Sequence, residues 1–208
     1  MTASTIAANQ VELSDLIDRL DLTRINDLDF FSEWQTDLPT LADLDRQLLD
    51  RVRDGYFNLI EYPPLREDAI RMAILDPILF IAGLYLPPFH IRSEAPISLE
   101  IPDEDRSISG RIDTLIFREH LWVMVIEAKR ASLSIEAGLA QLLTYLLAAP
   151  NPTNYGLITS GGEFIFVKLE QGTRPKYATS DMFVMRNRRR NELYEVLQIL
   201  KKLADLTT

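Results

Sequence analysis

Two neighbouring runs of strand-forming residues, 112–117 and 121–129, constrain this chain more than any other feature of its sequence. Both consist mainly of β-branched, aliphatic and aromatic residues, and only a short polar break separates them. Runs of this kind predict a hairpin whose two strands are buried on both faces. Asp113, Glu127 and Lys129 interrupt the runs with charge, and a charge near such a core requires a partner or a metal ion.

The geometry of a hairpin brings these three charges together. Folding about residues 118–120 places Asp113 near Glu127 and Lys129, because they lie at matching distances from the turn. Two carboxylates supply the oxygen ligands that Mg²⁺ or Mn²⁺ prefers, with substrate phosphate as a further ligand. The lysine could orient or deprotonate the attacking water, or stabilise charge on the phosphate. The competing interpretation is a buried ion pair of one lysine with two acids and no chemistry.

A helix predicted over residues 134–148 supplies two further polar side chains. Ser134 is suited to cap its N-terminus, and apolar residues recur at three- and four-residue spacing. Gln141 and Tyr145 are four residues apart, so they lie on the same face of the helix. A glutamine in so apolar a helix needs a hydrogen-bonding partner, such as a lysine, a water molecule or a phosphate oxygen. The alternative is a glutamine on the exposed side of the helix.

The ordered set of Asp113, Glu127-Ala128-Lys129, Gln141 and Tyr145 resembles the D…ExK…QxxxY pattern of the PD-(D/E)xK nuclease superfamily. In particular, the stretch from roughly residue 62 to 170 is similar to the nuclease domain at the N-terminus of type I restriction enzyme motor subunits, and to RecB-type nucleases. Ile112 stands where the pattern nominally has proline, a departure that many members share.

The resemblance implies an activity and a set of roles. The activity is Mg²⁺- or Mn²⁺-dependent hydrolysis of DNA phosphodiester bonds, with Asp113 and Glu127 as metal ligands. An acid on the first core helix often assists the metal site in this family, and Glu67 is the candidate. Lys129, Gln141 and Tyr145 complete the catalytic set. The alternative is a silent or partner-dependent module that scaffolds a helicase or restriction subunit encoded separately.

The pattern of elements predicts an α/β fold. Residues 1–60 form an acidic helical extension, with helices expected over 11–20 and 41–52, which could serve as a lid, an interaction arm or a homodimer contact. Residues 61–208 form the nuclease-like domain. Its helices and strands are expected near 65–75, 95–101, 111–117, 121–129, 134–148, 154–160, 163–169 and 188–206. This order predicts a central mixed sheet flanked by helices, which is the arrangement of a restriction-endonuclease-like core.

Charge is the main argument against a nuclease, because the chain carries a formal net charge of −9. The acids are unevenly distributed, however: residues 1–60 hold 12 acids and 5 bases, and the remainder holds 19 acids and 17 bases. The nuclease-like part is therefore close to neutral. An arginine cluster near its last helix is a candidate nucleic-acid contact, or alternatively a solvated helix flank. Its members are Arg186, Arg188, Arg189 and Arg190.

Other features set limits on location and chemistry. The absence of cysteine excludes disulfides and thiolate metal sites, and no secretory signal is recognisable, so we expect a cytoplasmic protein. The most apolar stretch, residues 73–89, is too short and too interrupted by proline to cross a membrane. There is no glycine-rich phosphate loop, so we expect no motor activity.

Overall fold

The computed structural model describes residues 4–62, 66–101, 106–119, 121–129, 136–160 and 162–206. This part of the chain forms a mixed sheet of nine strands in the order β1-β4-β5-β6-β7-β8-β2, with β3 also paired to β4 and β9 to β7. The strands are β1 (Ser4–Ala7), β2 (Thr23–Arg24), β3 (His90–Ile101), β4 (Arg106–Arg118), β5 (Leu121–Lys129), β6 (Thr153–Ser160), β7 (Glu163–Glu170), β8 (Lys176–Thr179) and β9 (Phe183–Val184). The α-helices are α1 (Leu13–Leu20), α2 (Asp43–Ile60), α3 (Glu67–Ile70), α4 (Asp76–Ile81), α5 (Glu136–Leu147) and α6 (Leu193–Leu206).

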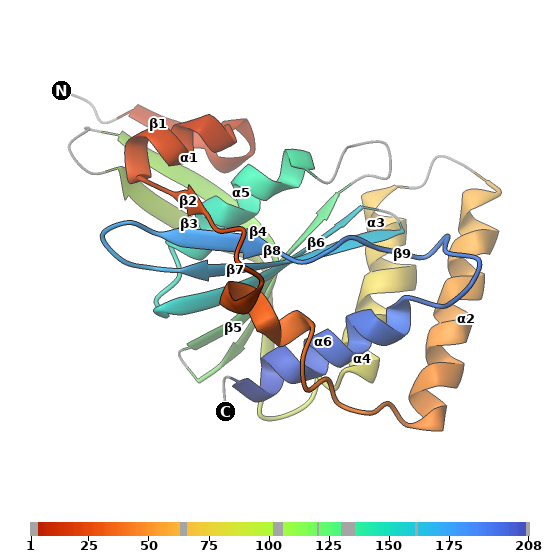
Figure 1. Cartoon of the computed structure of the whole chain (residues 1–208). Helices are drawn as coiled ribbons and strands as arrows, with labels where there is room; N and C mark the ends of the chain where they lie inside the picture. The colour runs from red at the N-terminus through yellow and green to blue at the C-terminus, as the bar shows by residue number, and fades with distance from the viewer. Residues whose placement is uncertain are drawn as a thin grey trace.

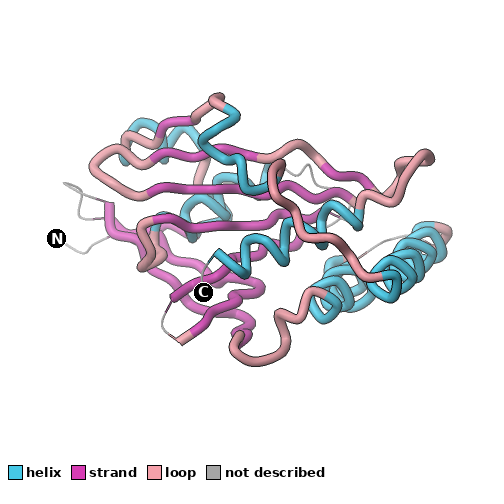
Figure 2. The backbone as a smooth tube through the Cα atoms, turned by 60° about the horizontal axis from the view of Figure 1, so that its bottom comes forward, coloured by secondary structure: helices cyan, strands magenta, loops and turns pink. Residues whose placement is uncertain are grey.

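Helices cover both faces of this sheet (Figures 1 and 2). On one face, α5 and α1 enclose a hydrophobic cluster that includes Leu142 and Leu16. On the other face, α2, α4 and α6 enclose a second cluster that includes Leu49, Ile78 and Leu197. The prediction of a mixed sheet between helices is therefore confirmed.

The central hairpin forms as the sequence predicts. β4 and β5 pair antiparallel, with Leu115 opposite Val125 and a bulge between Ile116 and Phe117. β5 then pairs parallel with β6, and β6 pairs antiparallel with β7. β5 is therefore an interior strand, which accounts for its apolar sequence from Leu121 to Ile126.

The N-terminal segment is more than a set of helices, because it also contributes two strands. β1 pairs parallel with β4, and β2 pairs parallel with β8. Strands of two and four residues are too short to show the alternation of apolar and polar residues that marks a strand. The helical periodicity of the segment therefore could not reveal them. Its second helix, α2, runs two turns beyond residue 52, and buries Leu49, Val52 and Tyr56. In α1, Leu16 is buried, whereas Ile17 is 43% exposed.

A largely buried ion pair fastens this segment to the sheet. The Lys168 ammonium on β7 lies 2.7 Å from the Glu33 carboxylate and donates to the carbonyl of Phe30 at 2.8 Å. The Tyr155 hydroxyl on β6 donates to the same carboxylate at 3.0 Å. Burial and the adjacent Glu33 charge both raise the pKa of Tyr155, so this hydroxyl remains a donor at neutral pH. The ammonium and the Oε1 atom of Glu33 are thus paired, whereas the buried Oε2 atom of Glu33 has no hydrogen-bond partner among the described residues.

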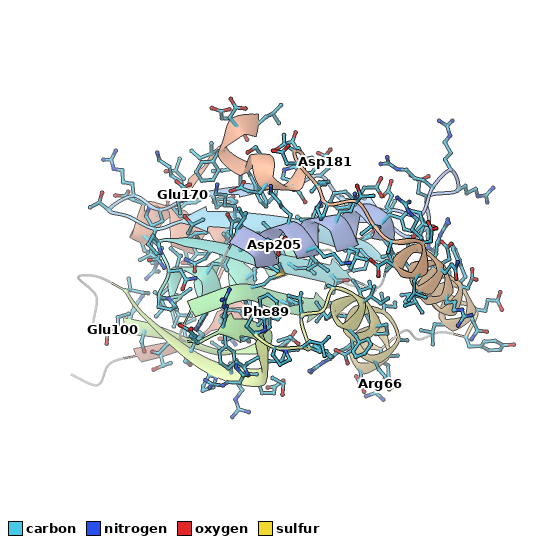
Figure 3. The ribbon with its side chains drawn as sticks, turned by 90° about the horizontal axis from the view of Figure 1, so that it is seen from below. Arg66, Phe89, Glu100, Glu170, Asp181 and Asp205 are labelled. Carbon is cyan, nitrogen blue, oxygen red and sulfur yellow. The ribbon has the colours of Figure 1, made fainter. Side chains whose placement is uncertain are left out.

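Two helical regions differ from their predicted limits. The helix expected from residue 65 to 75 continues through a π-helical turn, η3 (Arg71–Leu75), directly into α4. Pro77 is accommodated because it lies in the first turn of α4. The last helix, α6, starts at Leu193 rather than near residue 188, because β9 and a connecting loop precede it. Figure 3 shows α6 along the sheet, with Asp205 near its end and Arg66 beside the neighbouring helices.

Candidate functional site

The edge of β4 that faces β5 is shared by two strands. β5 pairs with β4 only as far as Thr114 opposite Ile126. β1 pairs with β4 from residue 106 to 109. β3 pairs along the opposite edge of β4 between residues 106 and 117, so β1 and β5 must lie on the same side. Among the described residues, 110–112 therefore have no strand partner on that side, and we call this gap, together with Asp113 and residues 127–129 of β5, the β4 fork.

Asp113 lies where β4 changes the face that its side chains present. Ile112 and Leu115 both belong to the cluster beneath α5, whereas Ile116 belongs to the opposite cluster. An uninterrupted strand would place 112 and 115 on opposite faces. The alternation therefore changes phase between them. At this level of β3, Glu94 has a left-handed backbone with φ of 52°, which is uncommon for a residue other than glycine.

Glu127 and Lys129 lie at the end of β5 that diverges from β4. Their backbones pair with Ile158 and Ser160 of β6, which fixes this end of β5 against its other neighbour. α3, the helix that begins at Glu67, contacts β5. The fold thus brings together the strand and helix segments that carry the predicted metal ligands. The side chains of Glu67, Glu127 and Lys129 lie outside the described part of the structure.

Gln141 and Tyr145 form a hydrogen-bonded chain that ends on β4. The Gln141 amide nitrogen donates to the Tyr145 hydroxyl at 2.7 Å, and this hydroxyl donates to the carbonyl oxygen of Arg111 at 2.8 Å. Both side chains are buried, so the alternative of an exposed glutamine is wrong. Their i, i+4 placement on one helix face is confirmed. The chain satisfies a backbone acceptor inside the β4 fork, two residues before Asp113.

Gly110 makes this close approach of α5 to β4 possible. A Cβ atom at this position would lie 2.7 Å from Cβ of Ala8 and 2.9 Å from the ring of Tyr145. Both distances are far shorter than van der Waals contact, so only glycine fits. Sequence reasoning did not single out Gly110 or the Arg111 carbonyl. The available signal was an isolated glycine within a strand, which often marks close approach of another group.

The predicted arginine cluster lies at the same end of the sheet as Lys129. Lys129 pairs with Ser160, Ser160 with Glu163, and Glu163 with Val184 of β9. These three strand steps of about 4.8 Å span about 14 Å. The loop after β9 carries the four arginines. Arg186, Arg188 and Arg189 are exposed, and Arg190 forms ion pairs with Glu192 and Glu195 at 3.2 Å each.

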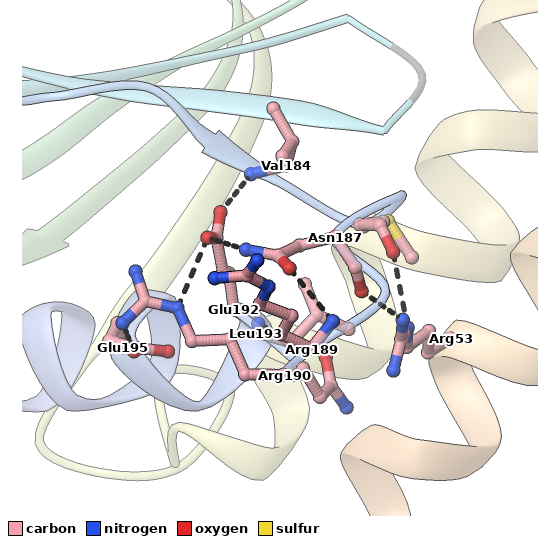
Figure 4. A network of polar contacts seen from close by, with 10 residues as sticks. Arg53, Val184, Asn187, Arg189, Arg190, Glu192, Leu193 and Glu195 are labelled. Atoms are coloured by element: carbon pink, nitrogen blue, oxygen red, sulfur yellow. Dashed lines mark hydrogen bonds and ion pairs between the residues drawn. The ribbon is translucent and has the colours of Figure 1, made fainter.

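Glu192 holds this arginine loop in place (Figure 4). Its carboxylate accepts from the Val184 amide and from the Asn187 side chain, each at 2.6 Å. Burial raises the pKa of Glu192, but hydrogen bonds from Val184, Asn187 and Arg190 outweigh it, so the pKa lies below its usual value. From the other side, Arg53 of α2 donates to the carbonyls of Met185 and Asn187. The loop is therefore held by contacts on two sides.

Two negative findings apply to the described residues. Within them, no group of three or more histidine, aspartate or glutamate side chains is placed to hold a metal ion. That search does not include the side chains of Glu67 and Glu127. Within the same residues, no helix is both long and apolar enough to span a bilayer.

Comparison of this chain with protein-family models and with curated protein sequences finds no match.

We predict that Gly110→Ala destabilises the protein and disturbs the β4 fork. The new methyl group must displace Ala8 or Tyr145, and overpacking of this kind costs about 1–3 kcal/mol. Gly55→Ala is the matched control, because nothing lies within 4 Å of its Cβ position in α2. That change should stabilise by about 0.5–1 kcal/mol. Urea denaturation of both variants measures the difference, and equal stability would refute the close approach.

We also predict that Glu192→Gln destabilises the protein by about 1.5–3 kcal/mol at pH 7, because the carboxylate anchors charge-assisted hydrogen bonds. The folded pKa of Glu192 is lowered, so its contribution is present above the unfolded pKa and disappears as pH falls through the folded pKa. The difference in unfolding free energy between wild type and variant should therefore become smaller as the pH is lowered. Glu195→Gln, which removes a more exposed partner of Arg190, should cost only about 0–1 kcal/mol. Urea denaturation across acidic pH measures both, and a gap independent of pH would contradict the assignment.

Proposed function

We propose that this chain is a metal-dependent nuclease of the PD-(D/E)xK type that hydrolyses DNA phosphodiester bonds on a restriction-endonuclease-like core. The single observation that carries the proposal is the β4 fork. Pairing between the two strands ends at Thr114 and Ile126, and the next residue on each strand is an acid, Asp113 or Glu127. Each strand therefore carries an acid directly beyond the last β4–β5 pair, which supports a metal site shared by the two strands.

The donor set of this fork suits a hard divalent cation. Asp113 and Glu127 would hold Mg²⁺ or Mn²⁺, with Glu67 of α3 as an assisting ligand, and the ion would supply Lewis-acid stabilisation of the phosphate and a more acidic water molecule. Lys129, two residues beyond Glu127, would orient the water for in-line attack or stabilise charge that develops on the phosphate.

Gln141 and Tyr145 fit a positioning role in this proposal. Their hydrogen-bonded chain restrains the Arg111 carbonyl, and therefore the backbone that leads into Asp113. A carboxylate that must meet a second ligand from another strand benefits from such restraint, because small displacements of a reacting group reduce rates strongly. Gln141 and Tyr145 would thus act through the backbone, whereas Lys129 would act on the reacting atoms directly.

The arginine loop offers a second point of contact for DNA. Arg186, Arg188 and Arg189 are exposed about three strand spacings from Lys129 along one end of the sheet. This distance of about 14 Å corresponds to roughly four nucleotides of one B-form strand. A strand cleaved at the β4 fork could therefore reach the loop, which would contribute affinity without sequence specificity.

We predict that the purified chain cleaves DNA only with Mg²⁺ or Mn²⁺, and that Lys129→Ala lowers the cleavage rate about 10²–10⁴-fold. Lys176→Ala, which removes an exposed lysine of β8, is the matched control and should cleave at the wild-type rate. Metal titrations against plasmid, linear and single-stranded DNA provide the measurement. Cleavage that persists in Lys129→Ala would contradict the site. Lack of cleavage under all conditions would instead favour the partner-dependent module.

A further inference from the structure

A groove of about 500 Å³ adjoins the β4 fork on the side of the N-terminal strand. Its walls come from β1 and the following turn, from β3, and from α5, and β4 provides its floor. Both polar residues of the Tyr145 chain lie at its α5 wall. The lining residues are Ala7, Ala8, Asn9, Pro96, Ile97, Ser109, Gly110, Arg111, Gln141 and Tyr145. A volume of this size is in the range of about 300–1,000 Å³ that accommodates small ligands.

The chemistry of the groove is unusual for so acidic a chain. None of the described residues that line it is acidic, although the protein carries a net charge of −9. Its charged member is Arg111, which is exposed. Apolar surface from Pro96 and Ile97 lies on the β3 side, and the amides and hydroxyls of Asn9 and Ser109 lie elsewhere along the wall. A guanidinium beside apolar and amide groups suits a ligand with an anionic end and a flat, hydrogen-bonding body.

The groove also has a defined position relative to the acids of the β4 fork. Arg111 precedes Asp113 by two residues on one extended strand, so their Cα atoms are about 7 Å apart. A phosphate held by Arg111 would therefore be close to a phosphate held at the fork. The ligand that this spacing favours is a chain with repeated phosphates.

We propose that this groove holds a nucleotide next to the scissile phosphate of an unpaired DNA strand, with Arg111 in contact with its phosphate. The inference rests on the nuclease function proposed above and specifies its substrate class. A groove that takes one nucleotide receives its base only when that base has left the stack of a duplex. Single-stranded DNA, or the unpaired end of a duplex, is therefore the preferred substrate.

The test measures binding separately from cleavage. Fluorescence anisotropy of a short labelled single-stranded oligonucleotide, recorded with the full chain in EDTA across a salt series, gives affinity and salt dependence. Arg111→Gln should weaken binding several-fold at low salt and reduce the slope of log K against log salt by about 0.7, the value for one phosphate contact on a single strand. The backbone carbonyl of residue 111 is retained, so the Tyr145 hydrogen bond is preserved. Arg174→Gln, an exposed arginine far along the sequence between β7 and β8, should leave both quantities unchanged.

A second variant tests the groove itself. Ala7 is exposed on β1 at the groove wall, so Ala7→Trp should obstruct the space without disturbing the core. We expect weaker binding of the single strand and little change for a blunt duplex. If wild type binds the single strand and Arg111→Gln binds it with the same affinity and salt slope, the groove is not the binding site, but the proposed nuclease function is unaffected. Equal losses for single strand and duplex would overturn the preference for unpaired DNA. A wild-type chain that neither binds nor cleaves DNA would overturn the proposed function itself, and this inference with it.

Discussion

The rest of the site depends on one constraint. The backbone groups of β4 need hydrogen-bonding partners in the stretch where β4 leaves β1 and has not yet begun to pair with β5. A carbonyl that is shielded from water and left without a donor costs up to about 1–3 kcal/mol, so a gap in strand pairing at a partly buried position favours a donor from another element. Here the Tyr145 hydroxyl donates to the Arg111 carbonyl, and Gln141 in turn donates to Tyr145. This arrangement brings α5 so close that residue 110 must be glycine. Asp113 lies at the border of this gap, directly before Thr114, the last residue of β4 that pairs with β5.

The acidic N-terminal segment belongs to this arrangement, because β1 forms one side of the β4 fork. Its attachment does not depend on β1 alone, since the buried Lys168–Glu33 pair ties the segment to β7, and Leu49 of α2 packs in the core. Glu33 of this segment is therefore engaged in holding the structure together. Two regions that face the proposed path of DNA, the groove at Arg111 and the loop at Arg186, carry exposed arginines instead.

Sequence reasoning predicted the parts of the fold whose periodicity is strong. The hairpin of β4 and β5 follows from two long apolar runs and is confirmed, and the helix expected near 188–206 is found as α6. β1 and β2 could not be predicted, because four and two residues give no period, and their partners lie far away in sequence. The stacking of Gln141 with Tyr145 was predictable from helical spacing. The target of that pair, the Arg111 carbonyl, depends on tertiary packing that no local pattern encodes. The joint role of Asp113, Glu127 and Lys129 stays a prediction.

The most direct test of the central claim is a crystal structure of the chain with Mn²⁺, because anomalous scattering locates this ion unambiguously. We predict one Mn²⁺ ion in the β4 fork, with oxygen ligands from both Asp113 and Glu127 and the Lys129 ammonium nearby. The ion should be absent from crystals of Asp113→Asn that are prepared in the same way. A structure in which Glu127 points to the other face of the sheet, with Asp113 paired to Lys129 and no ion between the strands, would contradict the account.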